Sequence, residues 1–268
     1  MRNSLDKNYL EHKVFIQLID YSEFYGYLSD STMSWITHGT DSSINIDTYV
    51  FSSIQGTLES IQDILFKGRI NDSYALLRKY YDSTIINIYS NLYLNDNFSI
   101  DNFIVAKINN WIKGKEKIPS FGAMSEYIIA SSKVSEVTNL IYKNGSFKGS
   151  LFEELRQRCN DHTHYLYYHN LLSNDNEVYL HNRLTTLDSF SNDIRHIFIL
   201  HLSYLFYLND HYMMSSDYED SIDAGQTPEE GSQYFVAPFI QDIFDKVIKP
   251  YRPDIVKIIK GKTAMLLE

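Results

Sequence analysis

The sequence predicts an all-α fold, an up-and-down helical bundle, from three observations. Apolar residues recur at intervals of three and four along most of the 268 residues, and no run alternates apolar and polar residues as a half-buried strand would. Apolar residues make up 44% of the chain and aromatic residues 15%, which is ample material for a core. No segment has the composition of a linker between domains, so residues 1–268 are expected to form a single domain.

A long antiparallel helix hairpin is expected from two consecutive segments. Residues 47–66 are predicted to be helical because apolar side chains step by four and three along them, at Val50, Ile54, Leu58, Ile61 and Leu65. Gly68 suits the C-terminal cap of this helix. The second helix is predicted from the N-cap pair Asn71–Asp72 to about residue 94. Because the link between them is short, the two helices should pack antiparallel.

The remaining elements follow from the same periodicity. Further helices are expected, in chain order, at residues 8–28, 102–112, 125–142 (one helix or two), 177–212, 237–248 and 254–259. Residues 29–43 and 215–233 are expected to be loops. The second loop is acidic and contains glycine and proline, so we expect it to be a flexible surface segment.

Composition narrows the class of protein. The net charge of −10 and the isoelectric point near 5.3 argue against broad binding to a nucleic-acid backbone, but are compatible with one local basic pocket. Cys159 is the single cysteine, which excludes an intrachain disulfide and a cysteine-rich zinc site; a reducing, cytoplasmic location is therefore expected. The N-terminal residues lack the apolar segment of a signal peptide. Residues 194–208, the most apolar stretch, contain charged and histidine residues, so no membrane span is expected.

One short cluster carries residue types suited to phosphoryl chemistry. It consists of Arg156, Arg158, Asn160, Asp161, His162 and His164, with His169 shortly after. Cleavage of RNA without a metal needs a base for the 2′-hydroxyl, an acid for the leaving 5′-oxygen and a cation for the crowded phosphorane. Histidine suits the first two roles because its ordinary pKa is about 6.5, and arginine suits the third through its permanent charge and bidentate fork.

Two geometries are open for this cluster. In a continuous helix, Arg158, His162, Tyr165 and His169 would share one face. If Asn160 or Asp161 instead capped a new helix, free backbone N–H groups would face an anion, and His164 could meet Arg158 across the turn. Both arrangements predict a phosphate pocket.

The cluster resembles the motif of the HEPN superfamily, helical proteins with an arginine, usually a polar follower, and a histidine after four to six intervening residues. Arg156 to His162 fits with five residues between and Gln157 as the follower. Arg158 to His164 also has five, but its follower, Cys159, departs from the pattern. We slightly favour the second register. The motif covers about nine residues of the chain.

The resemblance implies a metal-independent endoribonuclease that needs no cofactor and joins two motifs across a homodimer. Family members are often toxins or phage-defence effectors, so an antitoxin or regulatory partner is expected beside RNA. Arg158 or Arg156 would stabilise the phosphorane, and His164 or His162 would transfer protons. Asn160 and Asp161 would orient the pair.

Three further residues are expected to help bind RNA, through contacts that the acidic charge keeps local and weak. Tyr165 could stack on a base, His169 would lie one turn or so beyond the motif, and Arg78 could add a second cation. For Arg78 the favoured alternative is a structural ion pair with Asp82, four residues further along its helix.

Other interpretations of the same residues lead to a non-catalytic interaction or regulatory module. Arg156 and Arg158 could lie on a solvated helix face and pair with Glu153 and Glu154, and the histidines could belong to an exposed turn. The acidic charge and the 22 tyrosines favour this alternative over nucleic-acid binding.

Two predictions concern histidines in other roles. A metal site of His162, His164 and His169 is a weaker option, because two histidines one residue apart on a helix diverge by about 200°. His201 falls in an apolar stripe and is expected to be a hydrogen-bonded core residue.

Overall fold

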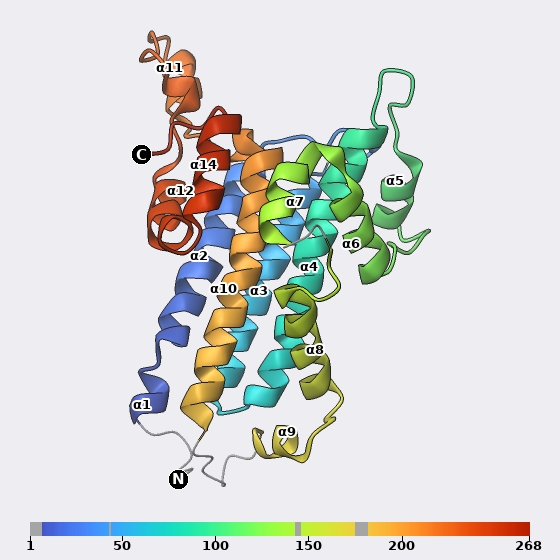
Figure 1. Ribbon diagram of the computed structural model, residues 1–268. Helices are drawn as coiled ribbons and strands as arrows, with labels where there is room; N and C mark the ends of the chain where they lie inside the picture. The colour runs from blue at the N-terminus through green and yellow to red at the C-terminus, as the bar shows by residue number, and fades with distance from the viewer. Residues whose placement is uncertain (1–6, 43, 143–145, 175–181) are drawn as a thin grey trace.

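The computed structural model describes residues 7–42, 44–142, 146–174 and 182–268, and within these ranges the chain is an all-α bundle without a β-strand. Four long helices lie side by side and form its body (Figure 1). They are α2 (Lys13–Thr32), α3 (Ile46–Phe66), α4 (Ile70–Asn97) and α10 (Arg183–Leu208). The expected fold class is therefore confirmed.

Shorter helices cover this body. They are α1 (Lys7–Leu10), α5 (Ala106–Ile112), α6 (Phe121–Ala130), α7 (Ser135–Ile141), α8 (Leu151–Thr163), α9 (Tyr168–Leu172), α11 (Asp217–Asp223), α12 (Pro238–Ile243), α13 (Lys249–Tyr251) and α14 (Pro253–Lys262). A π-helical turn, η5 (Phe244–Ile248), joins α12 to α13, and 3₁₀ turns lie at η1 (Ser132–Val134), η3 (Asp210–Met213) and η4 (Ser232–Tyr234). The C-terminal helices α12 and α14 pack beside α2 and α10 (Figure 1).

The hairpin of α3 and α4 forms as expected. The buried residues of α3 include Ile54, Leu58, Ile61 and Leu65, four of the five in the predicted stripe. Gly68 has a φ of 74°, a conformation that glycine adopts without a steric cost, and its N–H donates to the Leu65 carbonyl over 2.7 Å. The chain thus reverses over three residues, and α4 returns along α3.

Several expected boundaries were wrong. The helix predicted at 8–28 is broken by His12, whose backbone is extended and whose Nδ1 accepts a hydrogen bond from the Val14 N–H over 3.2 Å, so that it caps a new helix. Asn71 and Asp72 lie inside the first turn of α4 instead of capping it. Residues 102–105 are not helical, because α5 begins at Ala106.

Two later segments also differ from expectation. Residues 125–142 form two helices, of which the first begins earlier, at Phe121, after the N-cap Ser120. The segment 215–233, expected to be a loop, contains α11. Three acidic residues in the first turn of α11 favour helix formation there, because they complement the positive end of the helix dipole. The part of the long helix predicted at 177–181 lies outside the described residues.

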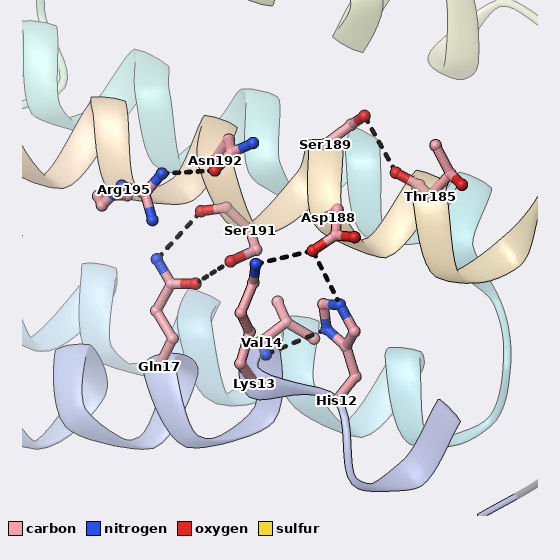
Figure 2. A network of polar contacts seen from close by, with 10 residues as sticks. All are labelled: His12, Lys13, Val14, Gln17, Thr185, Asp188, Ser189, Ser191, Asn192 and Arg195. Atoms are coloured by element: carbon pink, nitrogen blue, oxygen red, sulfur yellow. Dashed lines mark hydrogen bonds and ion pairs between the residues drawn. The ribbon is translucent and has the colours of Figure 1, made fainter. Parts of the chain in front are cut away.

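Polar contacts join α2 to α10 along their N-terminal halves (Figure 2). Lys13 Nζ lies 2.7 Å from Asp188 Oδ1, and His12 Nε2 lies 3.4 Å from the same oxygen. Gln17 and Ser191 exchange two hydrogen bonds, from Ser191 Oγ over 2.6 Å and to the Ser191 carbonyl over 3.0 Å. These contacts set how α2 lies against α10.

A line of polar side chains crosses the core. His201 is fully buried, and its Nε2–H donates to Asn87 Oδ1 over 2.9 Å. Its Nδ1 therefore accepts a hydrogen bond from the Tyr25 hydroxyl over 2.7 Å. The Tyr25 hydroxyl oxygen lies 3.1 Å from the Tyr80 hydroxyl oxygen, within hydrogen-bonding distance. Burial lowers the pKa of His201 to about 3, so the ring is neutral. The prediction of a hydrogen-bonded core histidine is confirmed.

None of the helices in the described ranges combines the length and the apolar character that a crossing of the lipid bilayer requires.

Candidate functional site

Helix α8 carries the cluster and runs through it without a break. Its N-cap is Ser150, whose Oγ accepts a hydrogen bond from the Glu153 N–H over 3.3 Å, while Glu153 Oε2 accepts from the Gly149 N–H over 2.6 Å. Phe152, Leu155 and Cys159 form the buried face. The helix continues past Asn160 and Asp161, so neither residue caps a new helix, and the second of the two expected geometries is wrong.

The face predicted for the continuous helix is interrupted after His162. His164 is the C-cap residue of α8, and Tyr165 has a φ of 50°, a left-handed conformation that side chains rarely adopt. This residue turns the chain toward α9. Asn170 Nδ2 donates to the Asp161 carbonyl over 2.7 Å and ties α9 back to the end of α8. Tyr165 and His169 therefore do not continue the face of Arg158 and His162.

Arg158, a residue of α8, is bound to Asp193 of α10. Its Nε donates to Asp193 Oδ2 over 3.0 Å and its Nη2 to Asp193 Oδ1 over 2.5 Å. The Asp193 side chain is 3% exposed, whereas the Arg158 side chain keeps 38% of its surface exposed. Hydrogen bonding to Asp193 raises the pKa of Arg158, so the guanidinium stays charged. A positive charge is thus held in place with part of its surface open to solvent.

Arg156 points instead toward α4. Its Nη1 lies 2.5 Å from Asp82 Oδ1, and its guanidinium carbon lies 3.5 Å from the centre of the Phe121 ring. Arg78 Nε lies 3.9 Å from Asp82 Oδ2, and Arg78 Nη1 donates to Asn160 Oδ1. The predicted Arg78–Asp82 pair is confirmed, and Arg78 also reaches the cluster. These residues connect α8 to α4.

Pairing of the two arginines with Glu153 and Glu154 was a wrong expectation. Arg156 and Arg158 take their partners from α4 and α10, because both side chains are partly buried where α8 packs on those helices.

His162 is held between α8 and α4. Its Nδ1–H donates to Asn71 Oδ1 over 3.0 Å, and its ring stacks on Tyr74 at 3.9 Å between centroids and 6° between planes. Burial lowers the pKa of His162 to about 4, and His169 lowers it further in the same direction. His162 is therefore a neutral packing residue near pH 7.

The end of α8 and the segment that follows present an exposed group of rings. His164 and His169 are exposed, and the His169 ring stacks with Tyr167 at 5.5 Å between centroids. We define the α9 surface by its exposed apolar and aromatic residues, Tyr165, Leu166, Tyr167, Tyr168 and Leu171. Tyr168 alone is 76% exposed. Five exposed apolar and aromatic side chains within seven residues of chain are typical of a binding surface.

Within one copy of the chain, the Arg158 and His164 side chains do not lie on the same face of α8. Six residues of α-helix turn by about 600°, so the two positions lie about 120° apart around α8. Asn160 is bound by Arg78, and the Asp161 carboxylate accepts from Gln157 Nε2 over 2.7 Å. Both side chains stabilise the helix and its packing in these contacts.

A second polar feature, which lies outside the predicted cluster, is a pocket beside the first half of α8 whose lining carries two arginines and the acidic residues Glu154 and Asp254. Arg195, His196 and Arg252 line a pocket of about 530 Å³ between α8, α10 and the helices at the C-terminus. Burial lowers the pKa of His196 to about 4, helped by Arg195, Arg158 and Arg252. Arg252 is paired with Asp254 at 2.7 Å. In the sequence, the pocket is indicated only by Arg195 and His196, two polar residues within an apolar helix. The same pair is equally typical of polar residues at the edge of a long helix.

Among the described residues, no group of three or more histidine, cysteine, aspartate or glutamate side chains could hold a metal ion. Cys159 is buried, and burial raises the pKa of its thiol well above the ordinary range, which makes it unreactive.

No protein-family model matches this chain, and no curated protein or solved structure proved similar to it.

Proposed function

We propose that the protein is a HEPN-like, metal-independent endoribonuclease that works as a homodimer, with Arg158 and His164 as the catalytic pair. The observation that carries the proposal is a fixed, partly exposed guanidinium on α8 and an exposed imidazole at the C-cap of that helix, next to the α9 surface. Arg158 would stabilise the negative charge of the phosphorane, and His164 would transfer a proton at the 2′-hydroxyl or the 5′-oxygen.

The contacts favour this register over the one that pairs Arg156 with His162. His162 is desolvated and neutral, with a pKa of about 4, so it is poorly suited to exchange protons near pH 7. Arg156 is held between Asp82 and the Phe121 ring. Both residues are accounted for by the packing of α8 on α4, whereas His164 has no such role in the described contacts.

A second copy is part of the proposal because of the angle between Arg158 and His164 around α8. In a twofold dimer built on α8 and α9, Arg158 of one copy would face His164 of the other, and each dimer would hold two equivalent sites. Such an interface would also cover part of the exposed α9 surface.

RNA would be bound locally, in keeping with the acidic net charge. Tyr165, Tyr167 and Tyr168 would stack on unpaired bases, while Arg158 contacts the phosphate. The pocket with Arg195 lies along the same side of α10, because Asp193, which binds Arg158, and His196, which lines the pocket, are three residues apart on that helix. Arg78 would act through Asn160 rather than touch the substrate. An enzyme of this type would act in the cytoplasm as a toxin or defence effector, restrained by a regulatory partner.

The test uses purified protein, single-stranded RNA and an excess of chelator. The native chain is expected to cleave, and His164→Ala and Arg158→Gln are each expected to lower the rate by about 100-fold or more. His162→Gln serves as the matched control and should retain most of the activity. Mixed dimers of His164→Ala and Arg158→Gln should regain activity, because one of their two sites is intact.

Loss of cleavage in the chelator, or equal cleavage by the native chain and both variants, would contradict the proposal.

A second candidate function is a non-catalytic interaction module. It is favoured by the ion pairs Arg156–Asp82 and Arg158–Asp193, which compensate both arginine charges, and by the apolar character of the α9 surface. Under this alternative, substitution of Tyr168 would abolish partner binding, and RNA would stay intact with every variant.

A further inference from the structure

A separate pocket lies at the opposite end of the bundle from α9. It has a volume of about 340 Å³ and lies between the segment after α2, the start of α3, the C-terminal half of α4 and η3. These helix ends lie at the end of the bundle opposite α9 (Figure 1). Buried polar residues, Asp47, Ser90 and Asn209, line it together with the exposed Trp35 and His38. The pocket is thus polar where it is deep and aromatic toward solvent.

Asp47 is the charged group of this pocket. The residue is 6% exposed. Its Oδ1 accepts hydrogen bonds from Asn87 Nδ2 over 2.7 Å and Asn91 Nδ2 over 2.9 Å, and its Oδ2 accepts from the Tyr212 hydroxyl over 2.9 Å. All three donors are neutral. Across the part of the chain that the structure describes, no lysine or arginine pairs with Asp47.

A buried carboxylate without a cation is costly, because neutral hydrogen bonds replace only part of the hydration that it loses. Its place in the first turn of α3 helps through the helix dipole, yet this effect is modest and does not require burial. Burial accordingly raises the pKa of Asp47. A cation bound beside Asp47 would therefore stabilise the ionised carboxylate.

Ser90 provides an independent observation. It is 2% exposed, it lines the pocket, and its buried Oγ has no hydrogen-bond partner among the described residues. Helical serines elsewhere in this protein, such as Ser83 and Ser203, satisfy the hydroxyl by donating to the carbonyl four residues before. Since buried polar groups are nearly always hydrogen-bonded, the Ser90 hydroxyl indicates a missing polar partner inside the pocket.

The aromatic rim adds an affinity for cations. Trp35 is 38% exposed, and its ring lies 4.8 Å from that of His211 and 6.1 Å from that of Tyr212, at interplanar angles of 78° and 54°. Rings at steep angles present both faces and edges to a common space. Tryptophan and tyrosine faces attract an entering ammonium group through their quadrupoles and then offer an apolar surface to its alkyl part.

We propose that this pocket binds a small organic ammonium ion. The ammonium group pairs with the Asp47 carboxylate and donates to Ser90 Oγ, and the alkyl part lies against Trp35. The volume suits a small molecule, and the net charge of −10 draws cations toward the protein. The proposal does not depend on the ribonuclease.

The experiment compares three probes of one shape in a Trp111→Phe background, which leaves Trp35 as the only tryptophan. The probes are n-butylammonium, n-butanol and butyrate, and the readout is Trp35 fluorescence. A saturable response to n-butylammonium alone is expected. Asp47→Asn should weaken binding by about tenfold or more. Asp63→Asn, an exposed carboxylate of the same helix, should leave the affinity unchanged.

Ser90→Ala keeps the test decisive if Asp47→Asn does not fold. The substitution removes a hydroxyl that makes no hydrogen bond in the described structure, so it should leave the folding intact while weakening binding of n-butylammonium several-fold. An equal response to n-butanol, a response to butyrate, no saturable response, or unchanged affinity in Ser90→Ala and any folded Asp47→Asn protein would each overturn the proposal.

Discussion

Arg158 on α8 and Asp193 on α10 form an ion pair with two hydrogen bonds, of 3.0 Å and 2.5 Å, across 35 positions of the sequence. The carboxylate is nearly inaccessible and the guanidinium is partly exposed. This pair both attaches α8 to the bundle and orients the cation on which the proposed chemistry depends.

Asp193→Asn is expected to destabilise the protein by about 1–3 kcal/mol, because a charge-assisted pair is lost while solvent still reaches the arginine. Urea denaturation followed by circular dichroism measures the change. Asp188→Asn is the matched control, since Asp188 is half exposed and pairs with the exposed Lys13, a contact worth less than about 1 kcal/mol. Equal effects of the two substitutions would contradict the structural role given to Asp193.

The stability of the protein should fall as the pH drops below about 6.5. His162 has a folded pKa of about 4, below the ordinary value of about 6.5, so below pH 6.5 the unfolded state binds more protons than the folded state. The stabilisation is therefore fully present above pH 6.5 and is lost toward pH 4. His196 and His201, with pKa values of about 4 and 3, act in the same direction.

The share of His162 in this effect is open to measurement. Urea unfolding of His162→Gln at pH 7 and pH 5 should show a smaller loss of stability on acidification than the native chain, by about 1 kcal/mol. Gln157, which is exposed on the same helix and does not titrate, makes the control, and Gln157→Ala should keep the native pH dependence. A native slope in His162→Gln would show that the ring is not buried as described.

His201→Ala should cost about 3–5 kcal/mol in the free energy of unfolding. The substitution leaves a cavity and removes the partner of both the Tyr25 hydroxyl and the Asn87 carboxamide oxygen. Thermal or urea unfolding gives the value. His169→Ala, at an exposed ring, should change stability by less than about 0.5 kcal/mol.

Tyr168→Ala should weaken binding of single-stranded RNA by about 5-fold or more without loss of stability, because an exposed stacking platform is removed. Fluorescence anisotropy with a short labelled oligonucleotide measures the affinity. Tyr49, which is 61% exposed on α3, provides the control, and Tyr49→Ala should bind RNA as the native chain does. Identical affinities for all three proteins would remove the α9 surface from the RNA-binding proposal.

The sequence predicted elements that local pattern determines. The α3–α4 hairpin follows from an apolar stripe and a link with Gly68, and both are read within one stretch of chain. The core role of His201 was predictable for the same reason, since its neighbours are apolar. The break at His12 was missed because it depends on a side-chain cap that a helical period does not show.

The ion-pair partners of the arginines in the cluster could not be predicted from the local sequence pattern. Arg156 and Arg158 bind Asp82 and Asp193, which are 74 and 35 positions away, so their pairing depends on how α8 packs on α4 and α10. The Asp47 site was missed as well, although Asn87 and Asn91 gave a signal. Two carboxamides four residues apart beside a buried stripe point to a polar group on a neighbouring helix.

The line of hydrogen bonds from Tyr80 through Tyr25, His201 and Asn87 to Asp47 touches all four long helices. Apolar attraction is non-directional, so by itself it distinguishes the native alignment from a slip by one helical turn, about 5.4 Å, less sharply than hydrogen bonds do. Here such a slip would leave donors and acceptors on two or more helices without partners. The hydrogen bonds at the centre of the bundle thus define how far each long helix is displaced along its axis relative to the others. The positions of the helix ends, at both ends of the molecule, follow from this alignment.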